Sequence, residues 1–186
     1  MGLVWKPTEF YHTEITMTIS LGIDIGREHD LTALVLVEET DSGEVWVRKA
    51  STMRQTPFDI QEAEIRAWKE MHDPSAIVID KTYNPQLAEN MRAEWPWLVQ
   101  EFGFTEQSKA DLIGKALELF TAGKVRCPQR YRMILEELSF IRKEITPAGN
   151  VVFRDSPHGD LGWACLMALW GLRRGAGEGV IIDFDY

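Results

Sequence analysis

The sequence predicts an α/β domain in which a mixed sheet carries helices on both faces. Strand patterns joined by short turns occupy residues 15–51, and short apolar runs then alternate with amphipathic helical segments. The chain has 186 residues, 45% of them hydrophobic, which suits one globular domain with a sizeable core. A meander that is followed by strand–helix units gives a sheet of mixed direction with helices on both sides.

The first part of the chain carries three strand signals. Residues 15–26 pass from β-branched alternation into an apolar run, and residues 31–39 and 44–51 follow as two further strands. Turn-forming residues separate them at 26–30 and at 41–43. We therefore expect an antiparallel three-stranded meander here.

The middle of the chain alternates helices with strands. The periodicity predicts helices at 58–72, 84–95 and 108–123, and short strands at 75–80 and 97–104. Asn84 is expected to cap the second helix, with Pro85 at its first position, and Gly123 is expected to close the third.

The C-terminal third is less uniform. Residues 131–145 mix apolar and charged residues and fit either a helix or a long strand, and residues 148–153 resemble the end of a hairpin. Residues 156–174 predict a helix with Ser156 as its cap. Because the body of this helix is apolar nearly all round, we expect it to lie deep in the domain.

Composition and charge exclude several classes of protein. The sequence has no run of roughly 18 or more apolar residues and no signal-peptide pattern, which argues against a membrane span and favours the cytoplasm. Cys127 and Cys165 form no CxxC pair, so a disulfide scaffold and a cysteine zinc site are excluded. The net charge of -9 argues against a protein that binds nucleic acid through a basic tail. Residues 1–18 are interpreted as a linker or lead-in, and residues 175–186 as a loose tail.

Three aspartates stand at boundaries between apolar segments and turns. Asp24 lies in the apolar strand around Ile23 and Ile25, Asp80 ends the run before the second helix, and Asp160 lies near the start of the last helix. Each has a purely structural interpretation, because Asp24 and Asp80 can cap turns and Asp160 can interact with a helix dipole. Taken together, the three can reach one edge of the sheet, where ligands of open α/β sheets bind.

Carboxylates that converge in this way would repel one another unless cations neutralise them. Mg²⁺ and Mn²⁺ prefer oxygen ligands and keep positions open for water and phosphate. Two such ions about 3.5–4 Å apart can activate water and stabilise the leaving 3′ oxygen when a phosphodiester is cleaved. The sequence therefore predicts a site for divalent cations, with two Mg²⁺ or Mn²⁺ ions expected.

Four segments together resemble the nuclease domain of phage terminase large subunits, most like those of the Mu-like prophage type, in the ribonuclease H-like superfamily. They are LGIDIGREHDLTALVLV (21–37), AIVIDKTYNPQLAENM (76–91), FTEQSKADLI (104–113) and SPHGDLGWACLMALW (156–170). The resemblance implies a nuclease domain at residues 19–174 with a central five-stranded sheet. It also implies a metal-dependent endonuclease that cuts concatemeric double-stranded viral DNA during genome packaging.

The resemblance assigns roles to individual residues. The three acidic metal ligands of the family fall on Asp24, Asp80 and Asp160, all of which are present. His158 is a candidate for assisting the metal-bound water or the leaving group, with a surface or capping role as the alternative. Asp30 is a candidate for holding the metal ligands in place without binding the metal itself.

The family's large subunits also carry a packaging ATPase, and this chain lacks the phosphate-binding loop of one. Ala116 follows Gly114-Lys115, with no glycine five residues before Gly114. The resemblance therefore implies an ATPase domain in the same polypeptide, together with a portal and a small terminase subunit as partners in the host bacterial cytoplasm.

Basic residues are candidates for contacts with DNA phosphates, with a solvated charged face as the alternative. They are Lys124, Arg126, Arg130 and Arg132 in one acid-free stretch, and Lys81 and Lys109 nearer the expected site.

Three other functions are compatible with parts of the pattern. A Holliday-junction resolvase or transposase would share the metal chemistry, and a non-catalytic packaging module would share only the fold. LGIDIG (21–26) also resembles the first phosphate loop of actin-like ATPases, but that fold needs a second glycine-rich loop and VIDKTYN (78–84) has no glycine after its aspartate.

Overall fold

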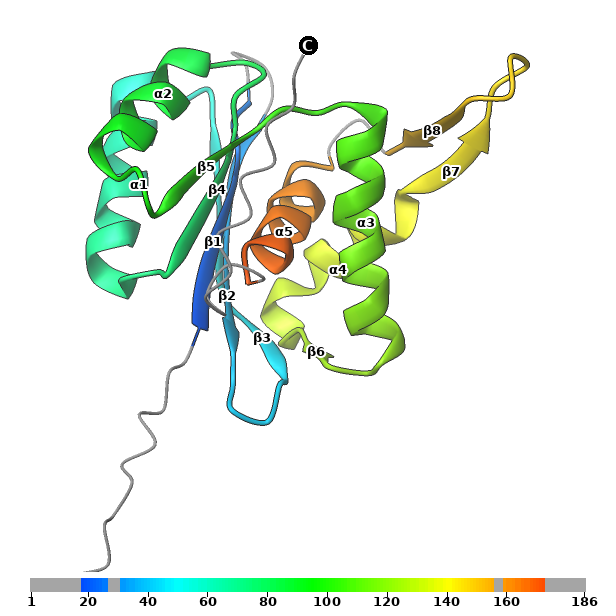
Figure 1. The fold of residues 1–186 in the computed structure, drawn as a ribbon. Coiled ribbons are helices and arrows are strands. Elements are labelled where there is room, and N and C mark those ends of the chain that lie inside the picture. Colours follow the sequence, from blue (N-terminus) through cyan, green and yellow to red (C-terminus); the bar gives the residue numbers. More distant parts are fainter. Residues whose placement is uncertain (1–17, 27–30, 156–158, 173–186) are drawn as a thin grey trace, which may run out of the picture.

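A computed structural model describes residues 18–26, 31–155 and 159–172 (Figure 1). Its main sheet has six strands in the order β5-β4-β1-β2-β3-β6. These strands are β1 (Thr18–Asp24), β2 (Leu31–Glu39), β3 (Val45–Arg54), β4 (Ala76–Asp80), β5 (Val99–Phe102) and β6 (Val125–Arg126). The pairs β1–β2 and β2–β3 are antiparallel, whereas β1–β4, β4–β5 and β3–β6 are parallel. The expected mixed sheet with an antiparallel meander is therefore confirmed.

The sixth strand corrects the expected count of five. β6 contains only two residues, and it pairs with the first two residues of β3. A two-residue strand carries no alternation that a sequence pattern could detect, because strand signals need about four residues or more. The extra strand extends one edge of the sheet without changing the fold class.

Helices cover both faces of this sheet, as Figure 1 shows. They are α1 (Phe58–His72), α2 (Pro85–Glu94), α3 (Glu106–Thr121), α4 (Arg132–Phe140) and α5 (Asp160–Gly171), with a short 3₁₀ turn η1 (Gln129–Tyr131) before α4. In Figure 1, α1 and α2 lie on one face, and α3, α4 and α5 lie on the other. No helix in the described ranges is long and apolar enough to cross a lipid bilayer.

Alternating residues of the central strands build two cores. Leu34 and Leu36 of β2 join the core under α1 and α2, whereas Ala33, Val35 and Val37 join the core that α5 fills. This alternation follows from the two-residue repeat of a strand that is buried on both faces. The predicted deep helix is confirmed, because nine of the residues of α5 are buried.

Glycines allow α5 to lie directly on β1. A Cβ atom on Gly22 would stand only 1.9 Å from the carbonyl oxygen of Ala164 and 2.5 Å from the nitrogen of Ala168. At the other end of the helix, a Cβ on Gly171 would stand 2.2 Å from Ser20 Oγ. At Gly22 the backbone of β1 therefore meets the backbone of α5, and this contact places the first residue of α5 near the end of β1.

The predicted helix boundaries hold in the middle of the chain and fail at its end. Asn84 caps α2 as expected, because its Oδ1 accepts a hydrogen bond from Leu87 N at 3.1 Å. The last helix begins at Asp160, with Gly159 at the N-cap position, so the expectation of Ser156 as its cap is wrong. Ser156 itself lies outside the described residues.

Residues 131–145 contain both of the structures that the sequence left open. α4 occupies the first part, and the strand β7 (Arg142–Ile145) follows. β7 pairs antiparallel with β8 (Val151–Arg154) in a separate two-stranded sheet, which confirms the expected hairpin. Residues 1–17 and 173–186 lie outside the described part, so the domain limits at residues 19 and 174 stay a prediction.

Candidate active site

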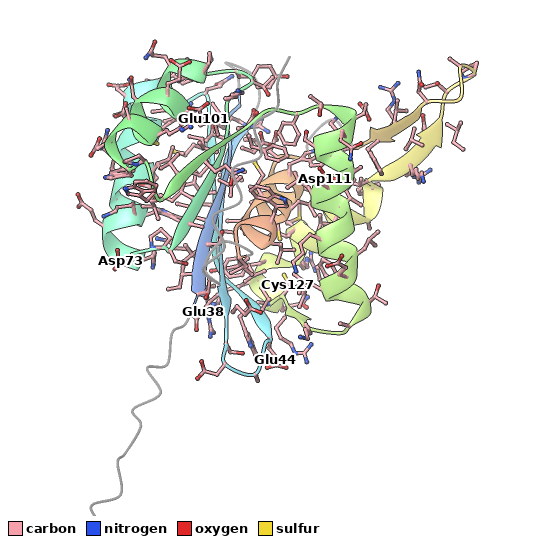
Figure 2. The ribbon with its side chains drawn as sticks, in the orientation of Figure 1. Glu38, Glu44, Asp73, Glu101, Asp111 and Cys127 are labelled. Atoms are coloured by element: carbon pink, nitrogen blue, oxygen red, sulfur yellow. The ribbon has the colours of Figure 1, made fainter. Side chains whose placement is uncertain are left out.

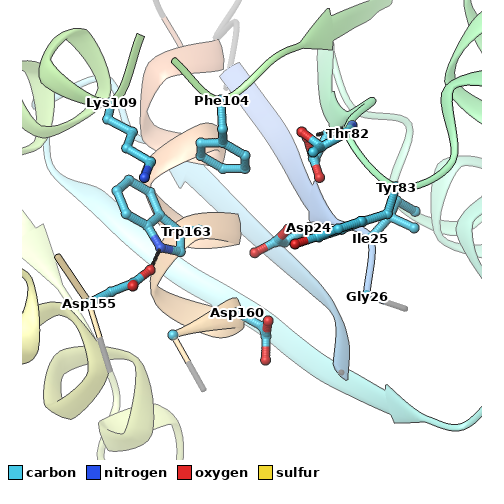
Figure 3. Close-up of a pocket in the computed structure, with 12 residues that line it drawn as sticks. Asp24, Ile25, Gly26, Thr82, Tyr83, Phe104, Lys109, Asp155, Asp160 and Trp163 are labelled. Atoms are coloured by element: carbon cyan, nitrogen blue, oxygen red, sulfur yellow. Dashed lines mark hydrogen bonds between the residues drawn. The ribbon is translucent and has the colours of Figure 1, made fainter. Parts of the chain in front are cut away.

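The three aspartates singled out in the sequence line one pocket (Figure 3). Asp24 is the last residue of β1 and Asp80 the last residue of β4, and these two strands are parallel neighbours. Their side chains therefore meet at the carboxyl-terminal edge of the sheet, where sites of α/β folds form. Asp160 enters the same pocket from the first turn of α5.

Asp24 lies at the centre of the acidic side chains. It is only 7% exposed, and Figure 3 shows it between Thr82 and Asp160. Burial raises the pKa of Asp24 well above its usual range, and the negative charges of neighbouring carboxylates raise it further. The neighbours that contribute are Asp80, Asp160, Asp155 and Glu137, in decreasing order. The pocket thus disfavours a bare carboxylate at this position.

Asp80 is fully buried, and only half of its carboxylate is used by the protein. The backbone N–H and the hydroxyl of Thr82 donate to Asp80 Oδ1 at 2.9 and 2.5 Å, so the expected turn-capping role accounts for one oxygen. Oδ2 is buried without a hydrogen-bond partner among the described residues. Burial raises the pKa of Asp80, although the hydrogen bonds from Thr82 oppose that shift. A buried acceptor without a partner is rare in folded proteins, and water or an ion can satisfy it.

Two further carboxylates near the pocket were not identified from the sequence. Asp155 lines the pocket, and its Oδ2 accepts a hydrogen bond from the indole N–H of Trp163 (Figure 3). Glu137 of α4 accepts from Gly162 N at 2.8 Å, and burial raises the pKa of Glu137 to about 7. Asp155 follows a strand five residues before Asp160, which was an available signal, whereas no sequence pattern pairs Glu137 with α5.

The opposite wall of the pocket is aromatic and basic. Phe104 and Trp163 meet edge to face, with ring centroids 5.2 Å apart. Lys109 Nζ lies 5.6 Å from the centroid of the Trp163 ring and 3.8 Å from Glu106 Oε1. The sequence placed Lys109 near the site, and its position in the pocket lining agrees with that expectation. A cation therefore faces the acidic side of the pocket.

The donor set fits hard divalent cations. Every acidic group in the pocket offers oxygen, and Asp80 Oδ2 is a buried acceptor for which the described residues supply no donor. No three acidic, histidine or cysteine residues in the described ranges are placed so that they ligate one ion together. Mg²⁺ is commonly held by only one or two carboxylates and completes its shell with water and substrate phosphate. The arrangement is thus compatible with ions that each use a pair of these aspartates.

The basic stretch lies at the other end of the sheet. Asp24 pairs with Ala33 at the pocket end of β2, whereas Val45 at the start of β3 pairs with Glu39 at the far end of β2 and with Val125 of β6. Six residues of β1 separate these two levels, or about 20 Å at the rise of a strand. Figure 2 shows Glu101, near the pocket end, and Glu44, at the far end, at opposite ends of the sheet. Lys124, Arg126, Arg130 and Arg132 therefore do not form the pocket, and their role as DNA contacts stays a prediction.

The remaining candidates have different surroundings. Lys81 follows Asp80 directly and places its Nζ 3.9 Å from Glu101 Oε2, so it stands beside the pocket rather than in it. His158 and Asp30 lie outside the described residues.

The mixed sheet, with acids at the ends of two neighbouring parallel strands and at the start of the helix that lies on them, defines a ribonuclease H-like domain. The family model described as the Terminase RNaseH-like domain matches residues 21–171, and the chain belongs to that family. This match confirms the resemblance seen in the sequence, and the Mu-like type stays a prediction. A comparison with curated proteins found no match.

Solved structures agree with this assignment at the level of the fold. The large terminase nuclease of thermophilic phage G20c with bound magnesium is 22% identical, with a TM-score of 0.71, over 86% of this chain and 83% of that one. The nuclease domain of the bacteriophage SPP1 large terminase with bound Mn is 12% identical, with a TM-score of 0.57, over 90% and 92%. The HK97 large terminase is 19% identical, with a TM-score of 0.60, over 84% of this chain and 39% of that one.

Proposed function

We propose that this domain is a divalent-metal-dependent endonuclease that cuts concatemeric double-stranded viral DNA during genome packaging. The observation that carries the proposal is the pocket in which Asp24, Asp80 and Asp160 meet, with Asp80 Oδ2 buried and without a partner among the described residues. Membership of the terminase family supports a packaging nuclease over a Holliday-junction resolvase or transposase. Magnesium and manganese in solved relatives support Mg²⁺ or Mn²⁺ as the ion.

The three aspartates would hold the ions, and two bound ions supply the activation of water and the stabilisation of the leaving 3′ oxygen. Asp24 is close enough to both Asp80 and Asp160 for their charges to act on it, so it would be able to share an ion with either of them. Thr82 fixes the rotamer of Asp80 and leaves Oδ2 for an ion. Lys109 faces the acids across the pocket, where its ammonium group can bind a phosphate of the strand that is cut.

The acidic pocket also explains how an acidic protein can act on DNA. A net charge of -9 and clustered carboxylates repel a phosphodiester, so bound cations are needed before the strand can enter. Phosphate contacts carry little sequence information, and we expect cleavage with weak sequence preference. Delivery of DNA would then depend on partners in the host bacterial cytoplasm, namely a packaging ATPase in the same polypeptide, the portal and the small terminase subunit.

Relaxation of a supercoiled plasmid tests the proposal. We expect nicking and linearisation in Mg²⁺ or Mn²⁺, none in EDTA, and loss of activity in Asp24→Asn, Asp80→Asn and Asp160→Asn. Asp111→Asn is the matched control, because Asp111 is an exposed acid on α3 whose carboxylate accepts a side-chain hydrogen bond from Gln107. Circular dichroism verifies that each variant is folded. Aspartate variants that cut as fast as the wild type would refute the ligand assignment.

The choice of substrate separates this function from its alternatives. A packaging nuclease cuts linear and supercoiled duplexes, whereas a junction resolvase prefers a four-way junction. Absence of cleavage with every divalent metal, by a folded protein that still binds Mn²⁺, would favour a non-catalytic packaging module.

A further inference from the structure

The first turn of α5 is capped by a side chain from another helix. Gly159 at the N-cap position offers no side-chain acceptor, although the N–H groups of a first turn need partners. Glu137 of α4 fills this role, because its Oε2 accepts from Gly162 N at 2.8 Å. The N–H of Leu161 also stabilises the Glu137 carboxylate. The turn that begins with Asp160 is therefore fixed from outside its own helix.

Two further features tie this contact to the pocket. A Cβ on Gly162 would stand 3.3 Å from Glu137 Cβ and 3.5 Å from Leu138 N, so glycine at this position lets α4 approach the first turn. Glu137 is also close enough for its charge to act on Asp160 and Asp24. Glu137 therefore stands beside the cluster of acids while its carboxylate oxygen accepts from the turn that begins with Asp160.

We propose that Glu137 is the positioning residue for Asp160, which it sets in place for metal binding by holding the N–H groups of the following two residues. The inference rests on the proposed nuclease function, since Asp160 is treated as a metal ligand. Removal of a residue that orients a metal ligand through hydrogen bonds typically lowers metal affinity or activity by about 10- to 100-fold. We expect the loss of Glu137 to have an effect of this size, although Glu137 does not contact the DNA.

Three variants separate the effect of the length of the Glu137 side chain from the effect of its charge. Glu137→Gln keeps an oxygen acceptor at the same distance and removes the charge, whereas Glu137→Asp keeps the charge and shortens the side chain by one methylene. Glu137→Ala removes both. Glu136→Ala is the control, because Glu136 is the exposed neighbour on α4 and pairs only loosely with Arg132, at 3.5 Å.

Mn²⁺ binding without DNA is the first readout, and plasmid cleavage across a Mn²⁺ series is the second. We expect Glu137→Ala and Glu137→Asp to bind Mn²⁺ about 10- to 100-fold more weakly, with cleavage recovering at high Mn²⁺. Glu137→Gln and Glu136→Ala should stay within about threefold of the wild type, since a retained acceptor or a distant change leaves the ligand in place. If Glu137→Ala fails to fold, the comparison of Gln with Asp decides alone.

The outcomes distinguish this inference from the nuclease function. Normal Mn²⁺ affinity in Glu137→Ala and Glu137→Asp overturns the positioning role while leaving the nuclease function intact. A loss in Glu137→Gln that matches the loss in Glu137→Ala also overturns it, because the charge would then matter and Glu137 would act as a ligand. A wild-type domain that binds Mn²⁺ but does not cut DNA contradicts the proposed function, and the Mn²⁺ titrations would still test the role of Glu137.

Discussion

The charged residues at the two ends of the sheet have different surroundings. At the far end, Arg126 pairs with Glu44 at 2.7 Å and Arg48 pairs with Glu38 at 2.8 Å, near the surface. At the pocket end, Asp24 and Asp80 are buried, and within the described residues neither has an ion-pair partner. Arg126 and Arg48 at the far end are thus neutralised by the protein itself, whereas the described residues provide no ion-pair partner for Asp24 or Asp80.

This difference has a thermodynamic meaning. Burial of a carboxylate without a partner destabilises a fold, and the raised pKa values of Asp24 and Asp80 express that destabilisation. Exposed ion pairs such as Arg126–Glu44 change stability by little in either direction. A fold that retains the unfavourable arrangement at one end is consistent with function at that end. Four expected effects test this comparison.

The largest effect concerns the contact between β1 and α5, which places Asp160 at the pocket. Gly22→Ala places a methyl group against backbone atoms of Ala164, and we expect a loss of about 3 kcal/mol or more in the free energy of unfolding. Gly114→Ala is the matched control, because nothing lies within 4 Å of its added Cβ and alanine favours a helix interior by about 0.5–1 kcal/mol. Urea denaturation measures both. A Gly22→Ala variant of normal stability would show that the backbone of α5 does not lie directly against β1.

Metal and pH are expected to act on the pocket end next most strongly. Mn²⁺ at about 100 times its dissociation constant should stabilise the domain by about 2.7 kcal/mol, because only the folded state binds it. Without metal, Glu137 has its pKa raised from 4.5 to about 7, and Asp24 and Asp80 shift in the same direction. Between pH 4.5 and about 7, the folded protein keeps a proton on Glu137 that the unfolded chain has lost. The free energy of unfolding therefore falls as the pH rises from about 4.5 through 7.

Thermal unfolding at pH 5.5 and pH 8, with Mn²⁺ and with EDTA, measures both effects. In EDTA the unfolding temperature should be lower at pH 8, and Mn²⁺ should restore more stability at pH 8 than at pH 5.5, since protonated carboxylates do not bind metal. An unfolding temperature that rises between pH 5.5 and pH 8 in EDTA would contradict the raised pKa values of these three carboxyl groups.

The amino-acid sequence was sufficient to predict this end of the molecule in outline. Asp24 and Asp80 each follow an apolar run whose end is visible in the pattern, and parallel neighbours bring such ends together. Glu137 was missed because its place depends on how α4 packs against α5, which no local pattern records. Asp155 was missed although its position directly after a strand, five residues before Asp160, was an available signal. β6 was missed because two residues carry no periodicity.

Asp24→Asn should separate stability from activity at the pocket end. The substitution removes the central charge of the cluster, and in EDTA at pH 8 we expect the variant to be more stable than the wild type by about 1–2 kcal/mol. Stabilisation by Mn²⁺ should shrink, and cleavage should be lost. Asp111→Asn, at an exposed position, should change none of these three quantities. A destabilised Asp24→Asn protein would mean that the carboxylate is satisfied within the fold and is not held ready for a cation.

The smallest effect is expected at the far end. Arg126→Ala removes the pair with Glu44 and a hydrogen bond to the carbonyl of Gly123, and we expect the free energy of unfolding to fall by at most about 1 kcal/mol. Cleavage of short duplexes centred on the pocket should be unchanged, because about 20 Å of strand corresponds to roughly six base pairs. Longer duplexes can reach Arg126. If Arg126→Ala cuts long DNA more weakly than the wild type and with less dependence on salt, but cuts short duplexes normally, this end of the domain binds DNA. If Arg126→Ala cuts both substrates as fast as the wild type does, Arg126 is only part of a surface ion pair. Its contact with Glu44 favours this outcome.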